Sequence, residues 1–562
     1  MSGDSFVLID GTASGDIIHC QEGLSFWGGV DPTSGIIIDI KHPQWGQSLS
    51  GKMVMMPTSR GSCSGSGVLL ALALANKAPA CLIFSEAEEI LTLGALVAGR
   101  IFDKTIPVIR LSKEAYQAVQ QAPYARLEKG QLITALHNFA LTPFVVDEMA
   151  LEETDKAYLS GAHGKAGQIA MEIICLMARA MGTTQLTSVT KGHIDGCILA
   201  HSANLIFAET MRDLGAEVVI PTTINAISVD RDHWLSQGQD ADFGEKASRL
   251  ADAYVAMGAQ PVFTCAPYLL DEAPAFGEVI GWSESNAVIY ANSVLGARSL
   301  KHPDYLDLCI AMTGRAPLAG VYFDEGRRPA SLIHVNAPDK QVDDAFWPLM
   351  GWLVGKLSPY HVPLVTGLDH LHSCQDDLKA FCAAFGTTSA APLVHIAGHT
   401  PEAHLAPLPE AKTTICDSYA IRDAWHSLNP DREKVNLIAI GAPHSSYDEM
   451  VQLHELIADR PIAAEMSLIA TTSRSAINKL REANLYDSLI KAGVTIYPDI
   501  CWCSITEPLF PPDTLSMLTN SAKYAHYAHG LMGKPANLAS LEDCVEAAIT
   551  GTASNTLPHW LS

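Results

Sequence analysis

Long hydrophobic runs are missing from this chain. Its longest apolar stretch, Val68–Ala75, falls far short of the ~20 residues that a membrane-spanning helix needs. The start of the chain, residues 1–5, has neither the basic residues nor the long apolar segment of a secretory signal. These absences predict a cytoplasmic protein that does not use a membrane as its partner.

Basic residues are scarce as well. There are 37 Lys and Arg residues against 61 Asp and Glu residues, which gives a formal net charge of −24. A charge of this sign argues against nucleic acid as the main partner, because the phosphate backbone would be repelled. It still allows a local basic pocket for a small substrate. The remaining composition, 48% hydrophobic and 17% charged, predicts a well-buried globular protein, and 562 residues predict two to four domains.

Several familiar catalytic and metal-binding motifs are also absent. The sequence has no Cys-x-x-Cys pair, no His-Glu-x-x-His and no Walker A loop. A segment of esterase type, residues 61–65, carries Cys63 at its centre where an esterase has its nucleophilic serine. The 13 cysteines are scattered without pattern, which fits a reducing compartment better than a disulfide framework.

The most informative feature that is present is Cys501-Trp502-Cys503. It closes the apolar run Val494–Ile500, which is typical of a buried strand. On an extended strand the two cysteine side chains point to the same face, where their thiolates could converge on a metal. Cys265 also lies where a predicted strand gives way to a turn. The alternative is that these cysteines are small core residues.

Short apolar strands alternate with helices along most of the chain. This pattern predicts an α/β fold of mainly parallel sheets covered by helices, with ligands at the carboxyl ends of the strands. Residues 1–125 are predicted as a small β/α domain, residues 126–142 as a linker, and residues 143–562 as a larger region of two or three α/β subdomains.

A loop rich in serine and glycine, Ser59–Gly67, connects a predicted strand to a predicted helix. Its backbone N–H groups, hydroxyls and one arginine would form an anion site at the helix start. The alternative is a flexible turn with a capping serine. The candidate residues of this loop are Arg60, Gly61, Ser62, Cys63 and Ser64.

Polar side chains also stand at other strand ends and helix starts. His193 and Asp195 share a face if their segment is extended, and could form an acid–base pair or a structural hydrogen bond. Lys523 could meet a substrate carboxylate or lie on the surface. The remaining candidates for substrate binding are His163, Lys165, Asn225, Ser285, Asn286 and Arg298.

These segments together resemble a known family. The loop Ser59–Ser66 resembles the swivelling domain of the aconitase superfamily, and the larger part resembles the catalytic portion of aconitase X. The resemblance covers nearly the whole chain. The matching catalytic segments are Pro221–Ala226, Thr264–Tyr268, Trp282–Ala287, Tyr290–Arg298, Gly441–His444, Asp499–Cys501 and Thr519–Lys523.

The resemblance implies an iron–sulfur dehydratase. The two parts are fused here, as in the single-chain branch that dehydrates cis-3-hydroxy-L-proline, whereas the two-chain archaeal branch dehydrates mevalonate 5-phosphate. Fusion implies that no separate small subunit is needed. The expected reaction removes the Cα proton and the 3-hydroxyl, and the resulting enamine tautomerises to Δ1-pyrroline-2-carboxylate.

The resemblance also implies cluster ligands. Two-chain relatives have a cysteine between Gly and Pro in the segment that reads Gly441-Ala442-Pro443-His444 here, so Ala442 marks a lost ligand. We therefore expect Cys265, Cys501 and, as the replacement, Cys503 to hold the cluster. Three ligands favour a 2Fe-2S cluster over 3Fe-4S or 4Fe-4S.

Analogy with aconitases makes Ser62 the expected base, with Ser64 and Cys63 as alternatives and Arg60 as the nearby positive charge. Because the base and the iron would come from different domains, domain closure would assemble the site and exclude water. The substrate carboxylate is expected at Lys523, Arg298 or the serine-rich loop, and the ring nitrogen or departing hydroxyl at His193 and Asp195.

Two rival interpretations remain. The first is a dehydratase of mevalonate 5-phosphate or another hydroxy acid, but a phosphate requires an extra basic cluster, and none is evident beyond the loop near Arg60. The second is a non-catalytic protein that binds an iron–sulfur cluster or a small ligand.

Overall fold

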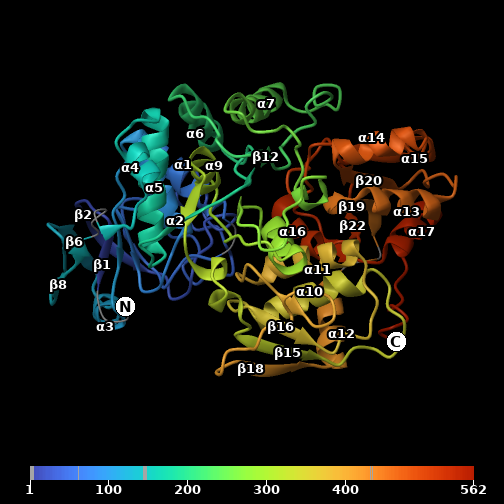
Figure 1. Ribbon diagram of the computed structural model, residues 1–562. Helices are drawn as coiled ribbons and strands as arrows, with labels where there is room; N and C mark the ends of the chain where they lie inside the picture. The colour runs from blue at the N-terminus through green and yellow to red at the C-terminus, as the bar shows by residue number, and fades with distance from the viewer. Residues whose placement is uncertain (1–4, 61–62, 144–147, 431, 433) are drawn as a thin grey trace. The chain divides into compact units, whose positions relative to one another are not determined.

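The computed structural model describes residues 5–60, 63–143, 148–430, 432 and 434–562. Gly61 and Ser62 lie outside the described residues. The chain divides into two compact units, and each is built from three stretches of sequence (Figure 1). The first unit comprises Met1–Thr222, Asp252–Ala259 and His302–Ala319. The second unit comprises Thr223–Ala251, Gln260–Lys301 and Gly320–Ser562.

The first unit contains a nine-stranded mixed sheet with the order β8-β7-β6-β2-β3-β4-β5-β1-β9. Its middle strands, β2 to β5, run parallel; β1 pairs antiparallel with β5, and β9 pairs parallel with β1 at the edge. The strands are β1 (Phe6–Ile9), β2 (Ala13–His19), β3 (Met53–Met55), β4 (Cys81–Phe84), β5 (Val108–Arg110), β6 (Tyr124–Glu128), β7 (Gln131–Ile133), β8 (Asn138–Ala140) and β9 (Thr142–Pro143).

Residues 126–142, predicted as a linker, are folded. They complete β6 and form β7 and β8, which extend the sheet as antiparallel hairpins. Leu127 and Leu132 are buried, and the turn between their strands has a positive φ at both Lys129 and Gly130. The apolar residues of this stretch fall mostly in adjacent groups and not at every second position, so its strand alternation is hard to detect in the sequence.

Helices cover the sheet of the first unit. The apolar helix α1 packs against α2, where Gly94 permits close approach: a Cβ there would lie 2.7 Å from the carbonyl oxygen of Ser66. Helix α5 packs on both α2 and α9. The helices and remaining strands are α1 (Gly65–Leu74), α2 (Ile90–Phe102), α3 (Lys113–Val119), α4 (Glu153–Leu159), α5 (Gly164–Ala180), α6 (Ser202–Asp213), α9 (Leu306–Thr313), β10 (Leu186–Ser188), β11 (Gly192–Ile194) and β14 (Arg315–Pro317).

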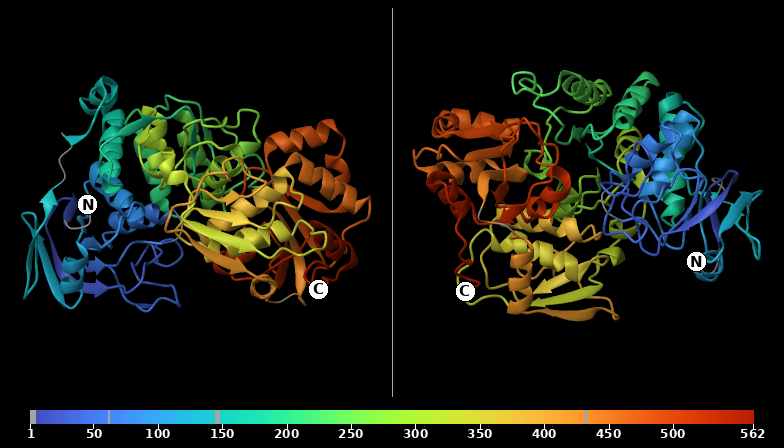
Figure 2. Two further views of the ribbon diagram at one scale, coloured as in Figure 1. Left: turned by 60° about the horizontal axis from the view of Figure 1, so that its bottom comes forward. Right: turned by 180° about the vertical axis from the view of Figure 1, so that it is seen from behind.

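The second unit contains two parallel sheets. The first has the order β17-β16-β15-β18, and Figure 2 shows it in yellow and orange with helices stacked on one side. Apolar residues of β15 and β16 share a core with α10 and α11. The elements are β15 (Ser331–Val335), β16 (Pro363–Thr366), β17 (His395–Ile396), β18 (Lys412–Cys416), α10 (Phe346–Leu357), α11 (Gln375–Thr388) and α12 (Ser418–Ser427).

The second sheet of this unit is covered on both faces. Its order is β21-β20-β19-β22-β23, and every pairing is parallel. On β19, Ile438 and Ile440 join the core with α13, α14, α15 and α17, whereas Leu437 and Ala439 face α16. The elements are β19 (Val435–Ser445), β20 (Ser467–Thr472), β21 (Val494–Tyr497), β22 (Ser516–Thr519), β23 (Ala536–Leu538), α13 (Tyr447–Ile457), α14 (Arg474–Glu482), α15 (Tyr486–Ala492), α16 (Ala522–Met532) and α17 (Leu541–Thr550).

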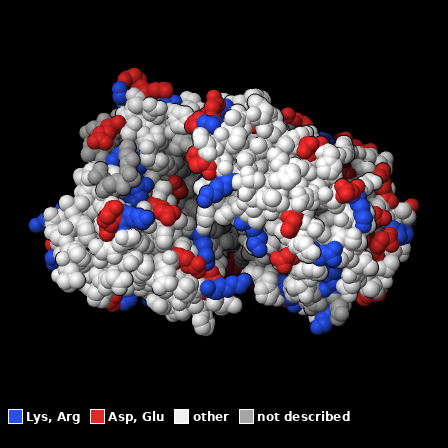
Figure 3. Space-filling model, turned by 90° about the horizontal axis from the view of Figure 1, so that it is seen from below, with Lys and Arg blue, Asp and Glu red and all other residues white. Residues whose placement is uncertain are grey.

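The predicted fold class, a small β/α domain fused to a larger part of helix-covered, mainly parallel sheets, is confirmed. No helix in the described ranges is both long and apolar enough to cross a membrane. Figure 3 shows acidic and basic side chains interspersed over the face that it draws. The remaining elements are α7 (Ala241–Ala256), α8 (Ser285–Tyr290), β12 (Thr222–Ile224), β13 (Gly281–Trp282), the π-helical turn Ala291–Leu295 and the 3₁₀ turns Pro267–Leu269, Gly320–Tyr322 and Glu325–Arg327.

Candidate functional site

The β19 sheet reverses its strand order beside β19. The chain runs from β19 to β20 and β21 on one side, then returns to β22 and β23 on the other. Loops that leave neighbouring strands in opposite directions open a crevice at the carboxyl edge of a parallel sheet. Strand β19 bends at Gly441, whose φ is +95° and where a Cβ would lie 2.1 Å from the carbonyl oxygen of Thr471. The hydroxyl of Ser521, after β22, donates to the carbonyl oxygen of Ala442.

The cysteine pair reaches this edge in a turn and not on a strand, which corrects the prediction. Strand β21 ends at Tyr497, before Pro498, and Asp499 has a φ of +66°. The N–H of Ser504 then donates to the carbonyl oxygen of Cys501 at 2.8 Å, which closes the turn. The proline lacks an N–H for the ladder and the αL residue bends the chain away from it, so extended geometry stops three residues early.

The structure brings the three predicted cysteines together. Cys265, Cys501 and Cys503 pack with Ala226 in one small cluster, and none forms a disulfide. Hydrogen bonds from the thiols of Cys265 and Cys503 lower the pKa of Cys501 well below its usual value, and the charge of Lys523 acts in the same direction. A thiol that ionises readily beside two others is a donor set suited to a thiophilic metal.

Lys523 lies beside the cysteines and forms an ion pair with Glu284. Its Nζ is 3.2 Å from Oε1 of Glu284, and both side chains are mostly buried. Burial alone lowers the pKa of Lys523, but the charges of Glu284 and Cys501 outweigh it and raise the pKa well above its usual value. Burial alone raises the pKa of Glu284, but the charge of Lys523 and the hydrogen bonds from Asn286 together outweigh it and lower the pKa, so the carboxylate stays ionised.

Two predicted asparagines hold Glu284 in place. Nδ2 of Asn225 donates to Oε2 of Glu284 at 3.1 Å, and Nδ2 of Asn286 donates to Oε1 at 2.6 Å. Nδ2 of Asn286 also donates to the carbonyl oxygen of Cys265 at 3.0 Å, and its Oδ1 accepts from the hydroxyl of Tyr268 at 2.8 Å. Glu284 was not among the predicted site residues, although a lone carboxylate in an apolar region of the sequence indicates a buried partner or a ligand.

His444 was not predicted either, and it contacts both cysteine segments. It is fully buried at the end of β19. Its backbone N–H donates to Sγ of Cys265 at 3.3 Å. Its Nδ1 lies 3.1 Å from Oγ1 of Thr264, and its Nε2 lies 2.8 Å from the carbonyl oxygen of Ile500. Thr264 and Ile500 are the residues directly before Cys265 and Cys501.

A second polar group lies in the first unit. The thiol of Cys63 donates to Oδ2 of Asp195 at 3.5 Å, and together with Asp304 their ligand atoms all lie within 4.8 Å of one another. The backbone N–H of Asp195 donates to Oδ2 of Asp307 at 2.7 Å. The structure thus joins two predicted residues, Cys63 and Asp195, with Asp304, which lies too far along the chain for spacing to reveal it.

Other predicted residues of the first unit have local partners. Arg60 lies 3.4 Å from a carboxylate oxygen of Asp39 and 3.6 Å from one of Glu22. Ser64 is the N-cap residue of α1, and its side chain makes no capping bond. His193 is fully buried in β11.

The two predicted residues at the start of α5 are exposed. The ring of His163 stacks on Tyr158 with the ring centroids 4.1 Å apart. Nζ of Lys165 lies 3.4 Å from Oε1 of Gln168. These contacts describe the surface of one helix pair, and a substrate role for either residue stays a prediction.

The last two predicted residues lie in the second unit. Arg298 donates to the carbonyl oxygen of Tyr322 at 3.0 Å and forms an ion pair with Asp324, so its guanidinium already has partners within the protein. Ser285 is the first residue of α8 and packs close to α11: a Cβ added at Gly386 of α11 would lie 3.8 Å from the Cβ of Ser285. Their predicted roles remain untested by these contacts.

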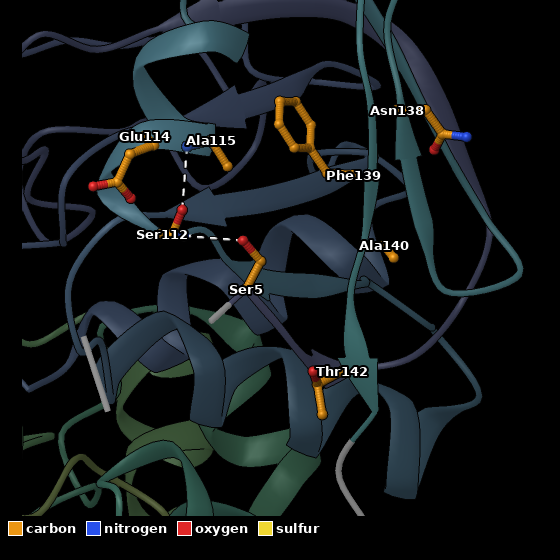
Figure 4. A pocket seen from close by; sticks show the side chains of 8 residues that line it. All are labelled: Ser5, Ser112, Glu114, Ala115, Asn138, Phe139, Ala140 and Thr142. Atoms are coloured by element: carbon orange, nitrogen blue, oxygen red, sulfur yellow. Dashed lines mark hydrogen bonds between the residues drawn. The ribbon is translucent and has the colours of Figure 1, made fainter. Parts of the chain in front are cut away.

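Two cavities lie outside the cysteine cluster. One, of about 390 Å³, lies between α3 and β8 of the first unit (Figure 4), and its lining includes none of the predicted site residues. The other, of about 570 Å³, lies in the second unit beside Asn520. Its carboxylates Asp344, Asp377 and Glu449 each accept a hydrogen bond from a backbone N–H at a helix start, so they already serve the fold.

Comparison with protein families matches nearly the whole chain. Four domain models match: the aconitase X swivel domain over residues 3–135, the first domain over 148–325, the second domain over 329–425 and the third domain over 435–550. The aconitase X third domain, residues 435–550, contains the cysteine turn, His444 and Lys523. The aconitase X first domain, residues 148–325, contains Cys265 and Glu284.

Individual proteins match over their full length. A Pseudomonas aeruginosa protein named cis-3-hydroxy-L-proline dehydratase is 45% identical over 99% of this chain and 98% of its own. A Hypocrea jecorina protein of the same name is 43% identical over 99% of this chain and 96% of its own. A crystal structure of Thermococcus kodakaraensis aconitase X in its holo form matches 71% of this chain and 100% of its own, with a TM-score of 0.65 and 28% identity.

Proposed function

The chain belongs to the aconitase X family, and from this premise we propose that it dehydrates cis-3-hydroxy-L-proline to Δ1-pyrroline-2-carboxylate. Such an enzyme is a carbon–oxygen hydro-lyase. The full-length similarity to two proteins named for this activity supports the reaction. The buried ion pair of Lys523 and Glu284 beside three cysteines is the structural observation that carries it.

This ion pair complements an amino-acid substrate. A hydroxyproline at neutral pH carries one carboxylate and one ring ammonium, so Lys523 would bind the first and Glu284 the second. Phosphomevalonate carries only negative groups, and the carboxylate of Glu284 would repel them. The pair therefore favours the hydroxyproline substrate over the phosphorylated rival.

The residues present fit an iron–sulfur cluster. Cys265, Cys501 and Cys503 would hold it, since their thiols converge in a buried site and a backbone N–H donates to one sulfur, as is common around such clusters. The family position at Ala442 offers no fourth thiolate, which favours a 2Fe-2S cluster in our proposal. When bound, iron with an open position supplies a Lewis acid for the departing hydroxide.

The remaining roles are also proposals. Ser62, or alternatively Ser64, takes the Cα proton, and His193 and Asp195 act on the ring nitrogen or the leaving hydroxyl. Additional substrate contacts are proposed for Arg60, Gly61, Cys63, His163, Lys165, Asn225, Ser285, Asn286 and Arg298. Because the swivel domain and the three other domains lie on one chain, we propose that the enzyme needs no separate small subunit. We also propose that it is cytoplasmic.

The test is turnover after anaerobic iron–sulfur reconstitution. The protein is incubated separately with cis-3-hydroxy-L-proline, trans-3-hydroxy-L-proline and mevalonate 5-phosphate, and the product of each is followed. We expect Δ1-pyrroline-2-carboxylate from the cis isomer alone. Turnover of mevalonate 5-phosphate instead would favour the rival dehydratase, and turnover of none would favour a binding protein.

A further inference from the structure

We propose that His444 is a positioning residue, whose imidazole holds the Cys265 and Cys501 thiols at the separation that metal binding requires. This inference rests on the proposed function, because it concerns the site at which the cluster would bind. His444 is not a ligand in this proposal. It acts on the residues that precede two of the ligands.

The hydrogen bonds of His444 fix its tautomer. A backbone carbonyl can only accept, so Nε2 must carry the proton and donate to Ile500. Nδ1 of the neutral ring is then an acceptor, and the hydroxyl of Thr264 donates to it. The same hydroxyl oxygen accepts the N–H of Ala266 at 3.2 Å, so the hydroxyl both donates and accepts. One ring therefore links two chain segments through directed bonds.

These segments need such a link because they are remote in sequence. Cys265 follows helix α7, whereas Cys501 follows β21. Segments this far apart in the chain keep their spacing only through tertiary contacts. His444 supplies such a contact from the end of β19, the strand at the switch of the sheet.

Its backbone contributes independently of the ring. The N–H of His444 donates to Sγ of Cys265, and its carbonyl oxygen lies 3.4 Å from Nζ of the buried Lys379. A side-chain substitution leaves these two contacts available. The imidazole bonds to Thr264 and Ile500 can thus be removed selectively, and in a fully buried position both partners would lose their hydrogen bonds.

The first experiment uses Cd²⁺ as the probe of the cysteine site. Cd²⁺ is titrated into the metal-free full chain, and the thiolate-to-cadmium charge-transfer absorbance is recorded for the wild type, His444→Ala and His444→Gln. We expect His444→Ala to bind Cd²⁺ about tenfold more weakly, the size typical of losing a group that orients a ligand. The amide of His444→Gln can still donate to Ile500, so it should restore most of the affinity.

A matched control is available in the same unit. His395 is also fully buried, and its Nε2 lies 2.7 Å from the carbonyl oxygen of Arg327, among residues other than the cysteines. His395→Ala should lower the thermal midpoint as His444→Ala does, yet bind Cd²⁺ like the wild type. Equal Cd²⁺ affinity in the wild type and His444→Ala would overturn the proposal, as would equal weakening in His395→Ala.

The second experiment uses the reconstituted protein. Iron and sulfide per chain, the electron paramagnetic resonance spectrum and the midpoint potential are compared in the same variants. We expect His444→Ala to change the spectrum and the midpoint potential. His444→Gln and His395→Ala should match the wild type. A wild type that binds Cd²⁺ in a His444-dependent way but turns over no substrate would sink the proposed dehydratase and support the positioning role. An unchanged spectrum and potential in His444→Ala would sink the positioning role alone.

Discussion

Each unit contains a buried cysteine among charged groups, and the two environments act in opposite directions. In the first unit, burial and then the charges of Asp195 and Asp307 raise the pKa of Cys197 well above its usual value. In the second unit, neighbouring thiols and Lys523 lower the pKa of Cys501. The comparison shows that burial alone does not decide the pKa of a thiol. Hydrogen bonds from neighbouring thiols, together with a nearby positive charge, can outweigh it.

The strongest way to break this comparison is to remove a thiol from the second unit. Cys501→Ser should abolish the visible absorbance of the reconstituted protein and lower kcat/KM by more than about 100-fold, because a ligand is lost. The measurement is absorbance and turnover after anaerobic reconstitution.

Cys374→Ser is the control for that variant, since this thiol is exposed. It should leave both quantities unchanged. If Cys501→Ser keeps the absorbance and the activity, the three cysteines are not the cluster site.

The next test removes the positive charge of the second unit. Lys523→Met should raise KM for cis-3-hydroxy-L-proline by about 10- to 100-fold, because a charge-assisted bond to the substrate carboxylate is lost and Glu284 is left unpaired. Steady-state kinetics separate KM from kcat. Lys479→Met, at an exposed lysine of the same unit, should change neither. An unaltered KM in Lys523→Met would show that the carboxylate binds elsewhere.

The acidic group of the first unit offers a smaller effect. Asp195→Asn should lower kcat by about tenfold, as expected when a group that assists proton transfer is weakened. Its spectrum after reconstitution should match that of the wild type, since the cysteines are intact. Loss of the spectrum in this variant would mean that Asp195 is needed for cluster binding. Asp213→Asn, at an exposed aspartate, serves as the control.

The smallest expected effect concerns a carboxyl that belongs to neither site. Burial raises the pKa of Asp344 from 3.8 to about 7, despite a hydrogen bond from the N–H of Leu541. A raised folded-state pKa contributes stability below 3.8 that is lost as the pH rises through about 7. Asp344→Asn cannot ionise, so its Tm relative to the wild type should increase by about 2–5 °C between pH 5 and pH 8.

Thermal unfolding at several pH values measures this difference. Asp448→Asn changes an exposed carboxyl of the same cavity and should show no such trend. A Tm difference for Asp344→Asn that is constant with pH would mean that its carboxyl titrates normally in the folded protein.

The sequence carries most of the architecture and part of the site. Alternation of strands and helices predicts the parallel sheets because buried parallel strands are continuous apolar runs, as in β19 and β20. The meeting of Cys265 with Cys501 rests on the family resemblance. The strands after Tyr124 escape detection because three short hairpin strands bury few side chains. The cysteine turn is not predicted because Asp499 adopts a positive φ, which the residue type alone does not predict.

Glu284, His444 and Asp304 escape prediction for a different reason. Each acts through partners that tertiary structure brings from remote segments, such as Lys523 for Glu284 and Ile500 for His444. A polar residue in an apolar region shows that some partner exists, but one sequence does not show which partner it is.

The interleaving of the two units has a consequence for synthesis on the ribosome. The stretch His302–Ala319 belongs to the first unit and supplies β14, which pairs with β10. An emerging chain therefore cannot complete its first unit until residue 319 has left the exit tunnel. By then two stretches of the second unit, Thr223–Ala251 and Gln260–Lys301, have been made without the rest of that unit. The β19 sheet, whose strands and helices are continuous in sequence, can fold as soon as it is made.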